Sequence, residues 1–439
     1  MSRSSLPPGN MGLPLVGETL SFISNVFGFL ETRQKQYGNI FKSNVLGRNV
    51  VFLAGTEGAE AFYNEENISR SQAHPPPVVD LFGGINTGML DGAKHFALKF
   101  IELKAFDHSA IATYLPDLQQ LMESGLSRMA KSGEFSAIAE LRRISIQCIW
   151  NNVLGSVSDD DTETIVTDYG SVLRGFVSLP VPITGTPYAR ARAARKRLFA
   201  RIKGVIRQRR AQPENDGISR LLTTKGPDDV MFTDDEAVLE VHHMVIAGFI
   251  VYGLLAESIR QLAEQPELRT RCRREVQENA LVGPLTLETL SKLQTCTNVV
   301  LEAKRYVPLV PFAFGRAKRE FSCSGFQIPA GWMTYLALSL NNKDRAIYKD
   351  PDRFDPDRFR PERAEHRKHP MAFIPQGAEP PSGHRCLGLD YSTFLGVAFM
   401  AVLLRDYDWE LPPQDFSYNW KTLPPEPRYG LRVRLRARK

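Results

Sequence analysis

The chain has 439 residues, of which 43% are hydrophobic and 24% are charged, an ordinary globular composition that allows a large buried core. Its net charge is +6, but the basic residues are scattered along the chain rather than clustered in a stripe. This pattern argues against nucleic-acid binding and leaves two interpretations, a basic face for an acidic electron-transfer protein or a merely solvated surface.

The cysteines exclude two further classes. They are odd in number and lack paired metal-ligand spacing, so the sequence predicts neither a disulfide framework nor a zinc site. They are Cys148, Cys272, Cys296, Cys323 and Cys386. No apolar run reaches the roughly 18 residues that a bilayer span needs, and no signal peptide is evident, so we expect a cytoplasmic protein.

The N-terminal half alternates extended and helical stretches. Residues 1–18 are rich in proline and glycine and predict an extended lead-in without regular structure, followed by a helix over 19–37 and a β-hairpin over 39–54. Residues 69–89 contain three consecutive prolines and several glycines and predict a long loop. From 113 to 212 the apolar spacing is largely helical.

His95 and Lys99 are four residues apart in a helix expected to begin near residue 91, so they share one face. Taken alone, such a pair is usually a solvated face. Residues 234–265 form the most apolar predicted helix, which implies burial through the centre of the molecule. Helices are also expected over 266–282 and 287–306, strands within 321–336, and a final hairpin after residue 407.

Glu302 and Arg305 are three residues apart on a predicted helix and can pair. Arg358 follows a proline-containing turn and could bring a second guanidinium to the same carboxylate. A buried carboxylate requires such partners. The alternative is an ordinary surface ion pair.

Cys386 lies in the segment FIPQGAEPPSGHRCLG, residues 373–388, directly before an apolar run with helical spacing. A helix N-terminus favours a thiolate. Three glycines allow tight turns around a bulky partner, and His384 and Arg385 place donors beside the sulfur. A simple helix-capping cysteine is the alternative interpretation.

The motifs ExxR at 302–305, PDRFDPDRF at 351–359 and HRCLG at 384–388 occur together in this order, and with them the chain resembles the cytochrome P450 family. In that family a cysteine thiolate is the axial ligand of haem iron. The resemblance implies a mainly α fold with a small β region, a single domain over residues 1–439 that encloses one haem b.

The resemblance also implies roles for individual residues. Cys386 would be the metal ligand and catalytic centre, and Glu302, Arg305 and Arg358 a structural triad behind the haem. The expected contacts to the haem propionates are His95, Lys99, Arg316 and His384. The expected substrate pocket comprises Leu81, Phe82, Ile85, Ala247, Gly248, Phe249, Val251, Tyr252 and Val310.

The central helix departs from the family pattern. Oxygen-activating members usually carry an acid and a threonine there, which relay protons to bound dioxygen. Here both positions are apolar, Ile250 and Val251. Tyr252 falls one position later and would point about 100° away around the helix.

Two subgroups share features with this chain. Residues 6–23, 37–55 and 178–198 resemble the retinoid- and sterol-oxidising branch with its cyanobacterial members, which favours a terpenoid-like substrate. The cysteine loop resembles bacterial fatty-acid peroxygenases, which use hydrogen peroxide. Those enzymes hold the substrate carboxylate with an Arg-Pro pair, where this chain has Ile250 and Val251.

Three functions therefore remain open. The first is hydroxylation or epoxidation of a terpenoid-like or fatty-acid-like substrate, driven by ferredoxin and its reductase or by hydrogen peroxide. The second is an oxidant-independent isomerase or dehydratase, and the third a non-catalytic haem-binding sensor. We expect a monomer in each case.

Overall fold

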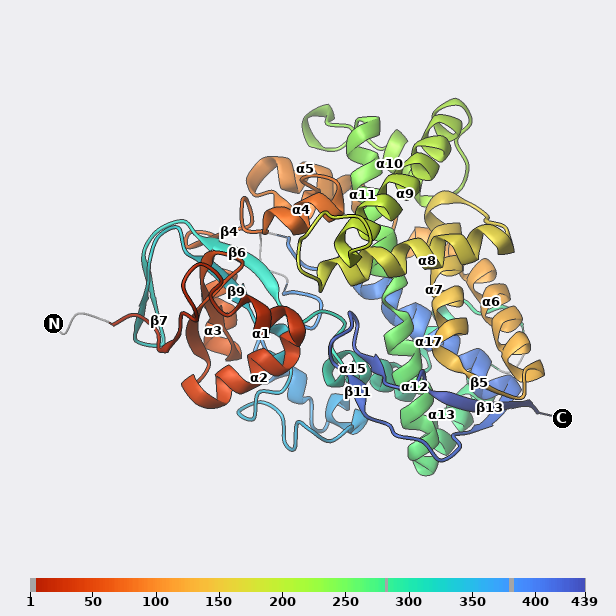
Figure 1. Ribbon diagram of the computed structural model, residues 1–439. Coiled ribbons are helices and arrows are strands. Elements are labelled where there is room, and N and C mark those ends of the chain that lie inside the picture. Colours follow the sequence, from red (N-terminus) through yellow and green to blue (C-terminus); the bar gives the residue numbers. More distant parts are fainter. Residues whose placement is uncertain (1–4, 281–282, 379–382, 439) are drawn as a thin grey trace.

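The computed structural model describes residues 5–280, 283–378 and 383–438. A larger helical part lies beside a smaller part built on a six-stranded sheet (Figure 1). The sheet has the order β1-β2-β3-β9-β6-β4, in which β2 and β3 form the predicted hairpin and β9 runs parallel to β3. This arrangement confirms the predicted mainly α fold with a small β region.

The other described strands form a three-stranded sheet, β10-β13-β5, and two two-stranded sheets. The strands are β1 Gly9–Asn10, β2 Ile40–Val45, β3 Arg48–Leu53, β4 Ile68–Ser69, β5 Glu134–Ser136, β6 Ala313–Ala317, β7 Phe321–Cys323, β8 Phe326–Ile328, β9 Met333–Leu336, β10 Tyr407–Glu410, β11 Tyr418–Asn419, β12 Glu426–Pro427 and β13 Arg432–Ala437.

The α-helices are α1 Thr19–Ser24, α2 Val26–Tyr37, α3 Gly55–Phe62, α4 Pro76–Phe82, α5 Gly92–Leu103, α6 His108–Lys131, α7 Ala137–Leu154, α8 Asp159–Phe176, α9 Pro187–Ala211, α10 Gly217–Thr223, α11 Asp234–Phe249, α12 Tyr252–Glu264, α13 Pro266–Asn279, α14 Leu287–Ser291, α15 Gln294–Tyr306, α16 Leu338–Asn341 and α17 Leu389–Asp406. Short 3-10 turns are η1 Thr87–Met89, η2 Pro227–Asp229, η3 Pro356–Phe359 and η4 Glu365–Arg367.

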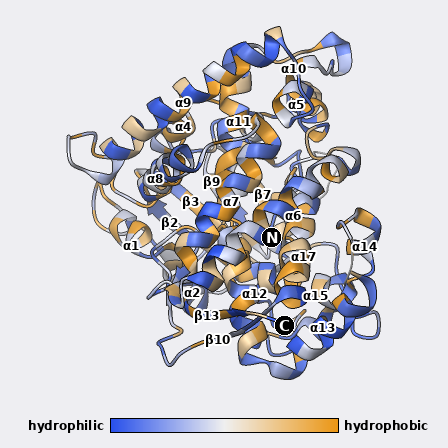
Figure 2. Ribbon diagram, turned by 90° about the vertical axis from the view of Figure 1, so that its right-hand side faces the viewer, coloured by the Kyte–Doolittle hydropathy of each residue, from blue (hydrophilic) through white to orange (hydrophobic). Residues whose placement is uncertain are grey.

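The core of the helical part forms where apolar faces of long helices meet. In Figure 2, α7, α12 and α17 are largely hydrophobic, whereas α9 at the edge carries many hydrophilic residues. Most of α17 is buried against α6, α13 and α15. Burial of these faces is the main favourable contribution to folding, and it fixes α17 against the surrounding helices.

The central helix predicted over 234–265 is divided into α11 and α12. Between them, the N–H of Val251 bonds to Gly248 O, three residues back, at 3.3 Å. Gly248 lets α11 approach α7 closely, since a Cβ at this position would lie 2.3 Å from a side-chain carbon of Ile149. The break therefore falls within the unusual stretch 247–251.

Asp234–Glu264 is also the one stretch of the described residues that is long and apolar enough to cross a bilayer. The expectation that no apolar run reaches this length was therefore wrong. Of its most apolar window, 78% is buried inside the protein, where α11 packs on α7 and α9. Burial against neighbouring helices accounts for this apolar character.

Two other predictions need correction. Residues 69–89 are not a continuous loop, because they contain α4 and η1. Pro76 lies in the first turn of α4, where the missing N–H of proline costs no hydrogen bond. Gly83 ends this helix with φ +88°. The lead-in is not free of regular structure, because β1 pairs in parallel with β2.

Candidate active site

The segment before α17 is folded so that Cys386 faces an internal cavity. The backbone N–H of Cys386 donates to Gln376 O at 2.9 Å, and Gln376 Nε2 lies 3.6 Å from the sulfur. Gly377 adopts φ +89°, and a Cβ there would meet His384 O at 3.0 Å, so this close approach of two chain segments requires glycine. Residues 379–382 of the motif lie outside the described residues.

The cavity has a volume of about 400 Å³ and extends from Cys386 to the face of α11. Its apolar walls come from the helical part and from the segment around β6. They include Phe82, Phe106, Ile149, Met244, Ala247, Gly248, Ile250, Val251, Leu309, Val310, Phe312 and Phe314.

One edge of the cavity carries basic and imidazole side chains. His95 and His384 stack with ring centroids 4.0 Å apart, and Lys99 Nζ donates to Arg385 O at 2.5 Å. Burial, followed by the charge of nearby Arg70, lowers the pKa of His384 to about 2. Desolvated cations and N–H donors at one edge would favour an anionic group.

Arg70 belongs to this edge, although no sequence motif indicated it. Its guanidinium is buried, donates to Phe314 O at 2.7 Å and lies 4.0 Å from the centroid of the Phe62 ring. Arg316, which the sequence placed at the cofactor, is instead held by Gln72 Oε1 at 2.9 Å and does not line the cavity. Arg316 therefore lies outside the cavity in this structure, and Arg70 lies at its edge instead.

Five of the nine predicted pocket residues line the cavity: Phe82, Ala247, Gly248, Val251 and Val310. Leu81 does not, because it points to the other side of α4 and packs against Tyr188 and Ala191 of α9. Ile85 is 53% exposed at the surface.

Phe249 and Tyr252 also lie outside the cavity. Phe249 is buried in the core between the rings of Tyr169 and Tyr252. The hydroxyl of Tyr252 lies 3.3 Å from a Glu426 oxygen and 3.5 Å from a guanidinium nitrogen of Arg142. Helical geometry turns both side chains away from the face that carries Ala247 and Gly248.

The three residues of the proposed triad meet on the far side of the cysteine segment. Arg305 donates to both oxygens of Glu302 at 2.7 Å, and Arg358 Nε donates to Glu302 Oε1 at 3.1 Å. All three side chains have no exposed surface, and none lines the cavity. A carboxylate buried this deeply is stable only with such partners.

Lys304, the residue between Glu302 and Arg305 that faces the other way, is buried beneath the first turn of α17. Its Nζ donates to Leu389 O at 3.1 Å, Ser392 Oγ at 2.9 Å and Thr393 Oγ1 at 2.8 Å. Burial lowers the pKa of Lys304 to about 7, and the negative charge of a Cys386 thiolate acts in the opposite direction.

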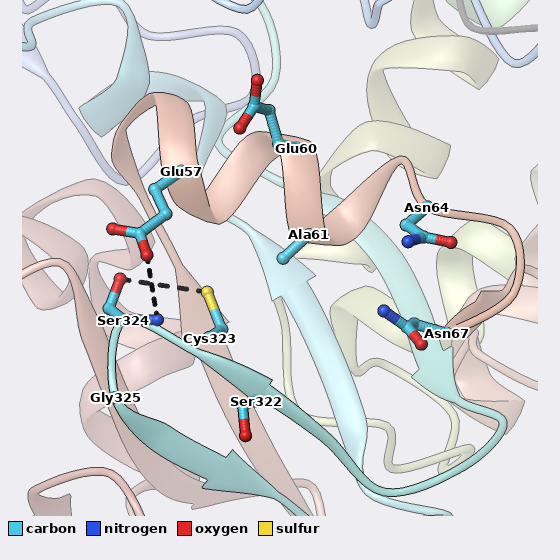
Figure 3. A pocket seen from close by; sticks show the side chains of 9 residues that line it. All are labelled: Glu57, Glu60, Ala61, Asn64, Asn67, Ser322, Cys323, Ser324 and Gly325. Atoms are coloured by element: carbon cyan, nitrogen blue, oxygen red, sulfur yellow. Dashed lines mark hydrogen bonds between the residues drawn. The ribbon is translucent and has the colours of Figure 1, made fainter.

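A second cavity, of about 450 Å³, lies between α3 and the β7–β8 hairpin (Figure 3). Its walls carry the carboxylates of Glu57 and Glu60 and one thiol, that of Cys323. Burial raises the pKa of Cys323 to about 11. A neutral thiol beside carboxylates suits an anionic, thiolate-bound cofactor poorly, which leaves the Cys386 cavity as the candidate active site.

The family model for cytochrome P450 matches residues 7–430. The chain belongs to the cytochrome P450 family. Among curated relatives, putative cytochrome P450 120 of Synechocystis sp. is 28% identical over 433 residues, which cover 98% of this chain and 96% of the relative. Abscisic acid 8'-hydroxylase 3 of Oryza sativa subsp. indica is 27% identical over 443 residues, which cover 98% and 86%.

Solved structures agree with this assignment. Retinoic acid bound cyanobacterial CYP120A1 superposes with a TM-score of 0.92 at 28% identity, covering 100% of both chains. Cytochrome P450EX alpha (CYP152N1) with myristic acid shares the fold, with a TM-score of 0.83 at 23% identity over 99% of this chain and 100% of that one. The family confirms the predicted haem cofactor and the oxidoreductase class.

The residues around the cavity fit a haem. Cys386 offers a sulfur ligand at one wall, Ala247 and Gly248 leave space opposite, and the edge with Arg70 and His384 matches a pair of propionates. Among the described residues, no group of three or more histidine, cysteine or carboxylate side chains could hold a separate metal ion.

Proposed function

We propose that this cytochrome P450 hydroxylates or epoxidises an apolar, terpenoid-like small molecule, with a fatty-acid-like substrate as the second choice. The observation that carries this proposal is the apolar wall above Cys386, which includes Met244, Val251 and Leu309. Two relatives support it by name, since retinoic acid and abscisic acid are both terpenoid acids.

Each part of the cavity has a proposed task. The haem, when bound, supplies the oxidation chemistry, and a thiolate ligand favours O–O cleavage. Cys386 would provide that thiolate, with the Gln376 amide donating toward the sulfur. Arg70, His95, Lys99 and His384 would hold the propionate edge, while the apolar walls exclude water and position the substrate.

Oxidant activation in this chain would be atypical. Ile250 and Val251 both line the cavity, and neither side chain can hold or release a proton. Proton transfer must therefore involve other residues, the substrate or water. The same apolar surface favours one second candidate, an oxidant-independent isomerase or dehydratase that needs no proton relay at this position.

We further propose a cytoplasmic monomer that receives electrons from a ferredoxin and its reductase, or uses hydrogen peroxide. The five cysteines, all of which lie in the described residues, form no disulfide, which suits a reducing compartment.

Product analysis under three conditions tests the proposal. A panel of retinoids, other terpenoid acids and fatty acids is incubated with the haem-loaded protein alone, with hydrogen peroxide, and with ferredoxin, reductase and NADPH. We expect oxygenated terpenoid products only when an oxidant system is present. Products formed without any oxidant would establish the isomerase or dehydratase, and no product under any condition would point to a sensor.

A further inference from the structure

Two buried glutamates face each other where α5, α11 and η1 meet. Glu102 of α5 lines the cavity, and its carboxyl group lies beside that of Glu240 of α11. Glu240 Oε1 accepts from the backbone N–H of Thr87 at 2.5 Å and from its hydroxyl at 2.8 Å. The other oxygen, Oε2, is buried and receives none of these bonds. A proton on Glu102 is the donor that this arrangement needs.

Two carboxylates in buried contact cannot both be ionised. Burial and then the charge of Glu240 raise the pKa of Glu102 well above its usual range, and Lys99, one turn earlier on α5, opposes this only weakly. The other titratable groups that face the pair are His95 and His243, whose pKa values burial lowers. At neutral pH the pair therefore holds one proton. The titratable groups around it are two neutral histidines and Lys99.

The pair opens onto the same cavity as Cys386. Glu102, Thr87 and His243 all line it, together with Ala247. Glu240, His243 and Ala247 are separated by three and four residues along α11, so they share one helical face. The pair thus reaches the cavity through Glu102, while Glu240 lies on the same face of α11 as His243 and Ala247, between two and three turns before the break in the helix.

We propose that Glu102 and Glu240 share a proton and act as the acid–base group for oxidant activation in this cavity, in place of the acid and alcohol missing at positions 250 and 251. The inference rests on the proposed function, because it supplies the proton transfer that oxygenation requires.

Hydrogen peroxide gives the simplest balanced reaction. The pair accepts the proton of one peroxide oxygen and returns a proton to the other. The O–O bond breaks, the second oxygen leaves as water, and the first forms the new C–O bond of the product. The substrate loses two electrons, the peroxide gains two, and the pair ends with the single proton with which it began.

Glutamine variants test the pair during turnover. Glu102→Gln and Glu240→Gln keep the shape of the side chain and remove the shared proton. With peroxide as oxidant, we expect each variant to lower kcat at least about tenfold, because removal of an acid–base group slows proton transfer. The spectral dissociation constant for the substrate should stay within twofold of the parent value. Because the two residues act as one unit, the double variant should lose no more than a single one.

The matched control is Glu257→Gln, since Glu257 is another fully buried glutamate whose pKa is raised by burial, but it bonds to Tyr418 and Gln261 away from the cavity. Its kcat should stay close to that of the parent. A kcat within twofold of the parent in Glu102→Gln, or equal losses in Glu102→Gln and Glu257→Gln, would overturn the proposal.

Infrared spectroscopy of the resting haem-loaded protein tests the shared proton without turnover. We expect a protonated-carboxyl band that shifts when imidazole binds in the cavity, and that disappears in Glu102→Gln and Glu240→Gln but persists in Glu257→Gln. Absence of a ligand-sensitive band in the parent would overturn the inference even if products form. A parent protein that shows the band but forms no product would overturn the proposed function instead.

Discussion

His242 of α11 is a fully buried histidine that the fold keeps neutral. Its Nε2 lies 3.2 Å from Leu81 O and donates to it as an N–H, while Nδ1 has no hydrogen-bond partner in the described part of the chain. Burial lowers the pKa of His242 to about 3, whereas a histidine in an unfolded chain titrates near about 6.5. At pH values between these two pKa values, the unfolded chain binds a proton at this histidine and the folded protein does not. The free energy of unfolding therefore falls as the pH falls.

This shift gives a measurable pH dependence. At pH 5, protonation of His242 in the unfolded chain alone lowers the free energy of unfolding by about 2 kcal/mol relative to neutral pH. His242→Gln keeps a donor for Leu81 O but does not titrate, so between pH 7 and pH 5 we expect it to lose about 2 kcal/mol less than the parent in urea unfolding. His108→Gln, at a side chain that is 67% exposed, should behave like the parent. Equal losses in His242→Gln and the parent would contradict the argument.

At the scale of elements, Lys304 connects α15 to the first turn of α17, three residues after Cys386. Its ammonium satisfies Leu389 O, Ser392 Oγ and Thr393 Oγ1, and Ser392 Oγ also lies 3.3 Å from Gln376 Nε2, which approaches the sulfur. Hydrogen bonds and charge near a ligand sulfur stabilise the more negative, reduced state of the iron.

Lys304→Met removes this charge and keeps most of the volume. We expect the haem reduction potential at pH 6 to fall by at least about 30 mV, half of the shift that accompanies a tenfold change in a one-electron equilibrium. Spectroelectrochemical titration measures it, with the ferrous carbonyl spectrum as a check that the thiolate is still bound. Lys292→Met, at a side chain that is 52% exposed, is the control and should leave the potential unchanged. An unchanged haem reduction potential in Lys304→Met would show that the lysine only stabilises the start of α17.

Short motifs made much of the site predictable, because their residues are close in the chain. Glu302 and Arg305 face each other within one helical turn, and Cys386 lies at a helix start that its own segment specifies. Arg70 was not predictable in this way, since its backbone partner Phe314 lies 244 residues later. Glu102 and Glu240 also come from elements whose contact no local pattern encodes.

In the fold, too, some features follow from local sequence and others depend on contacts between distant segments. The hairpin of β2 and β3 and the long helices follow from alternation and helical spacing, which local sequence carries. The prolines at the start of α4 predicted a loop, because a proline at a helix start and one in a loop have the same local signature. Leu81 and Phe82 are neighbours in sequence, yet only the packing of α4 against α9 decides which of them faces the cavity.

At the scale of the molecule, the cavity lies where the sheet part and the helical part meet. The residues that line it range from Tyr63 to Ser392, so segments from most of the chain contribute to its walls. Several basic and imidazole groups share one edge of this cavity. A bound group with two carboxylates would pair with the cations and N–H donors of that edge and fill the cavity.

Removal of the haem should therefore loosen the protein at defined places. We expect a lower thermal midpoint, because a ligand that binds the folded state stabilises it. Hydrogen exchange should quicken in α5 and in residues 375–377 and 384–388, which line the cavity, and change little in the second half of α17, which packs on α6 and α13. Readdition of haem should restore slow exchange.

Cysteine variants separate this local effect from general damage. Cys386→Ser should fail to give the thiolate-type ferrous carbonyl spectrum and should show rapid exchange in α5 even with added haem, whereas Cys323→Ser, in the other cavity, should bind haem and exchange like the parent. An increase spread evenly over all helices after haem removal would mean that the cofactor stabilises the chain only as a whole. An increase confined to the cavity edge would mean that the basic cluster around Arg70 and His384 is held in place by the propionates.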